Sequence, residues 1–113
     1  ATLYSLSGLI SAFQEEQAFR YEVVIFFILC FLALTLPISL SEAMLLPLNW
    51  LLVMAFELVN SAVEKAFDLI DKNYNPEIKV GKDMLSASVF LTIFLNAAYW
   101  IFLTIKYIFS AIV

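Results

Sequence analysis

Three long apolar runs, separated by polar segments, set the pattern of this chain. They cover about residues 21–38, 43–71 and 83–112. Because a helix rises about 1.5 Å per residue, crossing a hydrocarbon core of about 30 Å takes roughly 20 residues. The pattern therefore predicts three transmembrane helices.

Residues 2–20 are too polar to cross a bilayer, but their apolar side chains recur at spacings of three and four. The series consists of Leu3, Leu6, Leu9, Ile10 and Phe13. This spacing is typical of an amphipathic helix that lies in the membrane interface beside a transmembrane span. We therefore expect a surface helix over residues 2–20. Near its end, Glu16 and Arg20 have the i, i+4 spacing that permits an ion pair.

Two polar segments predict where the spans start and stop. Pro37 to Glu42 forms a short turn in which Ser39 and Ser41 offer N-cap chemistry for the next helix. Asn73 to Gly81 combines Asn, Pro and Gly and predicts the only real loop. No helix breaker separates the second run from the polar residues that follow it, so one long helix projects out of the membrane.

Composition supports a membrane protein with a single domain of 113 residues. Hydrophobic residues make up 64 %, charged residues 14 %, and the mean hydropathy is +0.96, which is too apolar for an ordinary soluble domain. A net charge of -4 without a basic cluster argues against nucleic acid as a partner. The chain has no histidine, so any acid-base or metal chemistry falls to carboxylates.

The basic residues predict how the chain is oriented. Arg20 precedes the first span, and no Lys or Arg lies between residues 36 and 43. Lysines that lie between the second and third runs are Lys65, Lys72, Lys79 and Lys82. The positive-inside rule then places the N-terminus in the cytoplasm and the C-terminus outside. Lys106, within the third run, is expected to snorkel to the far interface.

An acidic stripe follows the second run. At about 100° per residue, its members fall within roughly a third of the helix circumference: Glu57, Asn60, Ser61, Glu64, Asp68 and Asp71. Two carboxylates and an amide at this spacing can hold a divalent cation and leave one carboxylate free as a base, as phosphoryl transfer requires. The alternative is a solvated acidic face. It fits Asp68 and Asp71 better than Glu57, because a carboxylate at the membrane edge is costly without a partner or a function.

Two further groups could complete such a site. Glu16, Arg20 and Glu22 lie at the same membrane level as the stripe if the first two spans are antiparallel, which makes a third carboxylate available for the metal. The acids could equally stabilise a helix start. The segment 79–88 opens the third span, where free backbone N–H groups and Lys82 would favour a phosphate. No P-loop or glycine-rich fingerprint is present.

Several motifs together resemble the prokaryotic diacylglycerol kinase family, small membrane lipid kinases. They are YSLSGL from Tyr4, EEQAFRYE from Glu15, ELVNSAVEKAFD from Glu57 and GKDMLSASV from Gly81. Their order and spacing match along nearly the whole chain. The resemblance implies an all-α membrane protein with a surface helix, three spans and a homotrimer whose sites lie between protomers. It also implies a multi-pass protein of the bacterial inner membrane, with its C-terminus in the periplasm.

The resemblance implies a role for each matching residue. Glu57 is the general base that takes the proton from the lipid hydroxyl, and Mg²⁺ binds to Glu16 and Glu64. The substrate-binding positions are Glu22, Asn60 and Ser86. The nucleotide-binding positions are Tyr4, Glu16, Glu64, Asp68, Lys82 and Asp83.

The expected reaction is ATP- and Mg²⁺-dependent phosphorylation of diacylglycerol to phosphatidic acid. Undecaprenol is the alternative substrate, although AFRYE is closer to the diacylglycerol kinases. Ser7 replaces a basic residue that is usual in the family, which puts nucleotide contacts from the N-terminal end in doubt. A function of another class, a small oligomeric ion channel or transporter, would also use an acidic stripe but does not explain the match at Lys82 and Asp83.

Overall fold

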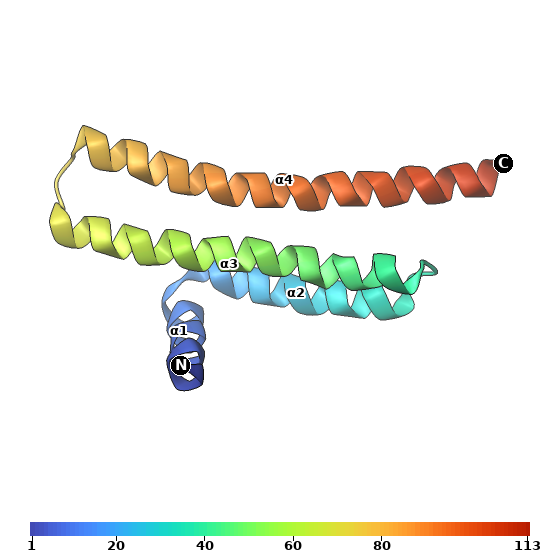
Figure 1. Ribbon diagram of the computed structural model, residues 1–113, viewed down its shortest axis with the longest axis horizontal. Helices are drawn as coiled ribbons and strands as arrows, with labels where there is room; N and C mark the ends of the chain where they lie inside the picture. The colour runs from blue at the N-terminus through green and yellow to red at the C-terminus, as the bar shows by residue number, and fades with distance from the viewer.

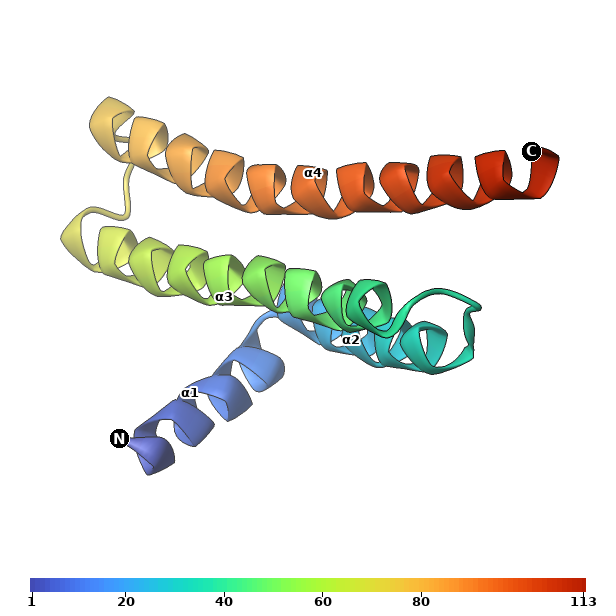
Figure 2. The ribbon, with the colours of Figure 1, turned by 45° about the vertical axis from the view of Figure 1, so that its right-hand side comes forward.

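The computed structural model describes all 113 residues as four helices joined by short turns (Figure 1). They are α1 (Thr2–Glu15), α2 (Gln17–Thr35), α3 (Leu40–Ile70) and α4 (Pro76–Ile112). α3 packs against α2 on one side and against α4 on the other, and each neighbour runs antiparallel to it. α1 points away from this layer in both views (Figure 2). The all-helical architecture is confirmed.

Three of the helices, α2, α3 and α4, are long and apolar enough to cross a membrane. Only 11 of the 113 residues are buried within the chain. Large apolar side chains therefore point outward along all three helices, as Phe27, Leu52 and Phe94 do. Because water would oppose so much exposed apolar surface, the fold is that of a membrane protein.

The joint between α1 and α2 differs from the expected helix over residues 2–20. α1 ends at Glu15, and Glu16 adopts an extended backbone, with φ −111° and ψ 110°, before α2 begins. Arg20 does not pair with Glu16, so the predicted ion pair is wrong. Instead, Arg20 Nη1 donates to the carbonyl oxygens of Phe13 and Gln14 at 2.9 and 3.0 Å. These are carbonyls at the end of α1 that lack helical partners, and capping them gives the guanidinium two acceptors.

Ser39 begins α3, as the sequence predicts. Its hydroxyl oxygen accepts a hydrogen bond from the Glu42 main-chain N–H at 3.3 Å, and the Glu42 carboxylate accepts from the Ser39 N–H at 3.1 Å. This reciprocal pair is a capping box. The helix then accommodates Pro47 and continues to Ile70, which confirms a single long helix through the acidic stripe.

The loop between α3 and α4 is shorter than the predicted Asn73 to Gly81. Asn75 caps α4, because its side-chain oxygen accepts from the N–H groups of Glu77 and Ile78 at 3.0 and 3.4 Å. Pro76 follows at the first helical position, where its missing N–H is harmless. The predicted anion site at a helix start over residues 79–88 is wrong, because these residues lie inside α4 and their N–H groups belong to the helix.

Polar side chains connect neighbouring helices. Trp50 Nε1 donates to the main-chain oxygen of Glu22 at 2.8 Å, which joins α3 to α2. Asn96 is buried and donates to the main-chain oxygen of Asn49 at 3.2 Å, which joins α4 to α3. Such hydrogen bonds hold membrane helices together more specifically than apolar contacts do, because lipid tails offer apolar side chains equivalent contacts.

Candidate active site

The first part of the acidic stripe faces α4 across a cavity of about 340 Å³. Glu57, Asn60 and Glu64 line it from α3, over two turns of one helix face, and Ser86 lines it from α4. The remaining wall is apolar and also belongs to α4: Val89, Phe90 and Ile93. The cavity therefore has polar groups beside an apolar surface, which suits an amphipathic molecule.

Glu22 reaches this region from α2. The antiparallel packing of α2 and α3, with Trp50 bonded to the Glu22 main chain, brings the two carboxylates of Glu22 and Glu57 close enough to repel each other. The Glu22 Oε1 and Asn60 Oδ1 atoms are buried and have no hydrogen-bond partner. A buried polar atom without a partner costs about 1–3 kcal/mol, so both atoms are candidates to bind a ligand.

Negative charge is concentrated here. The Glu57 carboxylate experiences the charges of Glu16 and Glu64 as well as that of Glu22. Lys65 neutralises part of this negative charge, because its Nζ lies 2.7 Å from Glu15 Oε2 and 3.8 Å from Glu16 Oε1. Since Lys65 bonds to the α1 end of the group, the carboxylates nearest the cavity still favour a cation.

The donor set fits a magnesium ion that is shared with a phosphate. No group of three or more Asp, Glu, Cys or His side chains is placed to form a complete metal site, so the predicted third carboxylate is not supplied within one chain. Mg²⁺ is commonly bound by one or two carboxylates plus substrate phosphates and water. Glu64 lines the cavity with the partnerless Asn60 oxygen, and Glu16 lies close enough to Glu57 for their charges to interact, so these groups provide hard oxygen donors of that kind.

Lys82 and Asp83 lie outside the cavity and are engaged in ion pairs. Lys82 Nζ lies 3.0 Å from Asp68 Oδ1 and joins α4 to α3 beyond the cavity. Asp83 pairs with Lys79 at 2.7 Å on its own helix. All four side chains are at least 39 % exposed, so these pairs can open at little cost.

Other predicted residues lie elsewhere. Tyr4 is 84 % exposed on α1 and does not line the cavity. Ser61 is buried and lines a different, larger cavity of about 500 Å³ between α3 and α1. Of the predicted site residues this second cavity contains only Glu16. Asp71 accepts a hydrogen bond from the Asn73 N–H at 2.9 Å and so belongs to the loop.

Sequence reasoning missed the apolar wall and the lysine. Val89, Phe90 and Ile93 follow Ser86 at helical spacings of three, four and seven, so this signal was available once Ser86 was assigned to a helix. Lys65 contacts Glu15 across 50 positions of sequence. No local pattern reports such a contact.

Comparison with known proteins identifies the family. A family model described as prokaryotic diacylglycerol kinase matches residues 3–104. The chain is 42 % identical over 100 residues to a diacylglycerol kinase of Haemophilus influenzae, covering 88 % of this chain and 85 % of that protein. It is 37 % identical to one of Pseudomonas aeruginosa, covering 88 % and 81 %, and 35 % identical to one of Escherichia coli, covering 86 % and 80 %. The chain is therefore an enzyme of the prokaryotic diacylglycerol kinase family.

Proposed function

We propose that this protein transfers the γ-phosphate of ATP to diacylglycerol. The observation that carries the proposal is the cavity between α3 and α4, where Glu57 lies opposite an apolar wall. A lipid that enters sideways from the bilayer could place its hydroxyl at Glu57 and its acyl chains along Phe90 and Ile93. The relatives are named diacylglycerol kinases, which supports this substrate over undecaprenol and supports a kinase over a channel.

In the proposed reaction, Glu57 takes the proton from the lipid hydroxyl as that oxygen attacks the γ-phosphorus of ATP in line. The bond from this phosphorus to the β,γ-bridging oxygen breaks, and ADP leaves. Asn60 donates from its side-chain NH2 group to an oxygen of the lipid headgroup, Ser86 donates to the headgroup from α4, and Glu22 lies beside the headgroup from α2. Lys82 leaves its ion pair with Asp68 and donates to an oxygen of the ATP phosphates instead. Magnesium, held by Glu16, Glu64 and the ATP phosphates, would supply positive charge against the charge that develops on the transferred group.

A mixed-micelle assay with radiolabelled ATP tests the substrate and the metal together. We expect phosphate transfer to diacylglycerol in the presence of Mg²⁺, less than a tenth of that rate with undecaprenol, and none with excess chelator. A faster reaction with undecaprenol would replace the substrate assignment. Loss of label to water or no transfer to either lipid would overturn the proposal.

We also propose that the enzyme is a homotrimer whose sites lie between protomers. Tyr4 and Asp83 do not reach the cavity within one chain, and most large apolar side chains point outward. Co-assembly of inactive Glu57→Gln and Asp83→Asn subunits tests the arrangement, because a site that takes Asp83 from a neighbouring protomer would regain activity. Mixed assemblies that stay inactive would place each complete site within one chain.

The proposed topology has the N-terminus and the α3–α4 loop in the cytoplasm, where ATP is present, and the C-terminus in the periplasm. Lys72, within this loop, supports the topology under the positive-inside rule. Labelling of a single cysteine at position 73 in intact spheroplasts, after Cys30→Ser, is expected to fail until the cells are permeabilised.

A further inference from the structure

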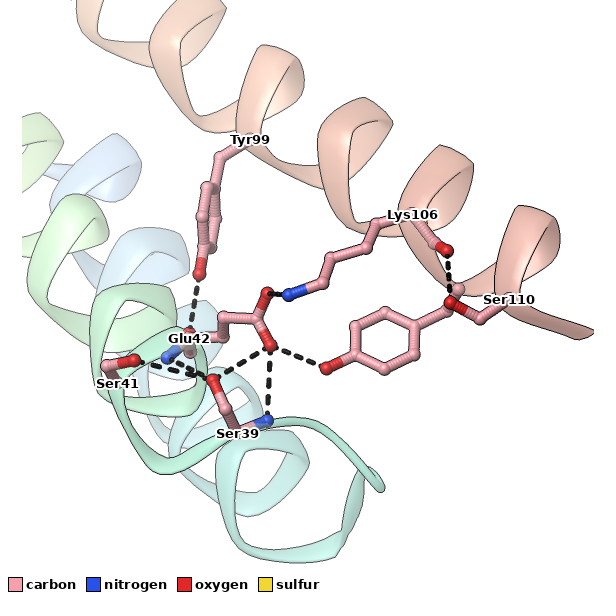
Figure 3. Close-up of polar contacts among 7 residues, drawn as sticks. Ser39, Ser41, Glu42, Tyr99, Lys106 and Ser110 are labelled. Atoms are coloured by element: carbon pink, nitrogen blue, oxygen red, sulfur yellow. Dashed lines mark hydrogen bonds and ion pairs between the residues drawn. The ribbon is translucent and has the colours of Figure 1, made fainter.

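A polar cluster occupies the end of the α3–α4 pair that is opposite the α3–α4 loop (Figure 3). Glu42 lies at its centre with 8 % of its surface exposed. Its Oε2 accepts from Lys106 Nζ at 2.7 Å, and its Oε1 accepts from the Tyr107 hydroxyl at 2.5 Å. Oε1 also accepts from the Ser39 hydroxyl at 2.9 Å. We call this group the far cluster: Ser39, Glu42, Tyr99, Lys106 and Tyr107.

The far cluster joins three parts of the chain. Ser39 belongs to the turn after α2, Glu42 to the first turn of α3, and the other members to α4. Tyr99 adds a second attachment, because its hydroxyl donates to the main-chain oxygen of Glu42 at 2.8 Å. Lys106, which was expected to snorkel to the far interface, forms an ion pair with Glu42 at this end of the helix pair and is 47 % exposed. α4 is thereby fixed to α3 at two points about two turns apart.

Fixing α4 here determines the register of the whole helix pair. Apolar contacts between two membrane helices are nearly unchanged by a slip of one turn, because lipid tails offer equivalent contacts. Polar contacts are lost by such a slip. Glu42 and Asn60 are 18 residues apart, which is five turns, so they lie on the same face of α3 about 27 Å apart. Midway, Asn96 bonds to Asn49 in the same antiparallel register.

The contact at the other end cannot hold the register during turnover. Lys82 and Asp68 are 39 % and 60 % exposed, and both belong to the proposed nucleotide site. Lys82 has to leave Asp68 when it binds a phosphate. Since that step breaks the Lys82–Asp68 ion pair, the polar contacts that still join α4 to α3 are the Asn96 hydrogen bond and the far cluster.

We propose that Glu42 is a positioning residue for phosphoryl transfer. Through Lys106 and Tyr107 it sets the register of α4 against α3. The register in turn places Ser86 of α4 across the cavity from Glu57 and Glu64, and it places Lys82 of α4 beside Asp68. The catalytic part of this inference rests on the proposed lipid kinase activity, whereas the register itself can be measured without any activity.

The kinetic test compares Glu42→Gln and Lys106→Met with Lys106→Arg, which keeps the charge. A merely structural role would lower the amount of active enzyme and hence the maximal rate, but would leave KM unchanged. We expect the first two variants to raise the KM for ATP by about ten-fold or more. Lys106→Arg should stay within about three-fold of the parent enzyme, and the double variant should be no worse than either single one.

Matched controls come from the same chain. Ser110→Ala removes a hydroxyl that bonds only to the Lys106 main-chain oxygen of its own helix. Lys72→Met removes a lysine that forms no ion pair. Both controls should leave the KM for ATP unchanged.

The register is measured by pulsed electron spin resonance on Cys30→Ser protein with spin labels at Leu69→Cys of α3 and Met84→Cys of α4, both exposed positions. Glu42→Gln should broaden or shift the interspin distance distribution, and Ser110→Ala should not. An unchanged distribution together with an unchanged KM would overturn the proposal. A changed distribution in a protein without kinase activity would retain the register and reject the proposed function instead.

Discussion

Glu22 and Glu42 are equally buried, each with 8 % of its surface exposed, but their hydrogen bonding is opposite. The Glu42 carboxylate accepts from four donors: the Ser39 N–H, the Ser39 hydroxyl, Lys106 and Tyr107. Glu22 Oε1 has no donor and lies near the charge of Glu57. Burial alone therefore does not reveal what a carboxylate does in this protein.

This difference in hydrogen bonding distinguishes a carboxylate that stabilises the fold from one that is available to bind a ligand. A carboxylate whose partners are all supplied by the chain has no capacity left for a ligand, but it can fix the position of the helices that supply them. A buried oxygen without a partner is tolerated where a ligand supplies the missing bond. By this criterion the far cluster supports the fold, and the cavity around Glu57 is the place that we propose for the chemistry.

The largest expected effect comes from Glu57→Gln. Removal of a general base should lower kcat by about 10²–10⁴-fold, while the thermal unfolding midpoint should not fall, because charge repulsion with Glu16, Glu22 and Glu64 decreases. Phosphate transfer in mixed micelles and a melt followed by circular dichroism measure the two quantities. Glu77→Gln, an exposed carboxylate at the start of α4, is the matched control. Near-normal turnover of folded Glu57→Gln would remove the base assignment.

Glu64→Gln distinguishes a metal ligand from a substrate ligand. We expect the Mg²⁺ concentration for half-maximal activity to rise by about ten-fold or more, because the amide cannot neutralise the cation. Glu22→Gln should instead raise the KM for diacylglycerol and leave the Mg²⁺ dependence nearly unchanged. If both variants shifted only the Mg²⁺ dependence, the separate roles of Glu22 and Glu64 would be wrong.

A pair of stability measurements tests the comparison of the two buried carboxylates directly. Glu42→Ala should lower the thermal midpoint by about 5–10 °C, because Lys106, Tyr107 and Ser39 all lose their acceptor. Glu22→Gln should leave the midpoint unchanged or raise it by about 2–4 °C, because it removes an unpaired buried charge. Equal losses from both variants would contradict the distinction.

The smallest effects are expected at the two glycines. A Cβ on Gly81 would lie 2.8 Å from the Phe67 ring, whereas a Cβ on Gly8 would meet nothing within 4 Å. Gly81→Ala should therefore cost about 1 kcal/mol despite its gain in helix propensity, and Gly8→Ala should gain up to about 1 kcal/mol. Chemical denaturation in detergent measures both. Adding Phe67→Leu should recover part of the Gly81→Ala loss, and no recovery would exclude the close contact as its cause.

The sequence alone identified the elements with local signals. Apolar runs of sufficient length predicted the three long helices, Ser39 predicted the start of α3, and helical spacing placed Glu57, Asn60 and Glu64 on one face. Motif spacing also indicated the family that the comparisons establish. Boundaries were less certain, because Asn75 and Pro76 can end a helix or begin one, and only the hydrogen bonds to Glu77 and Ile78 show which.

Only the tertiary structure decided which distant side chains meet. In the structure, Ser61 lines a different cavity, and Arg20 bonds to main-chain oxygens rather than to Glu16. Lys65 pairs with Glu15 across 50 positions of sequence, and Lys106 pairs with Glu42 across 64. Helical periodicity fixes the face on which a residue lies, but not the register of one helix against another. That register depends on a few polar contacts, because apolar side chains in a membrane pack almost equally well after a slip of one turn.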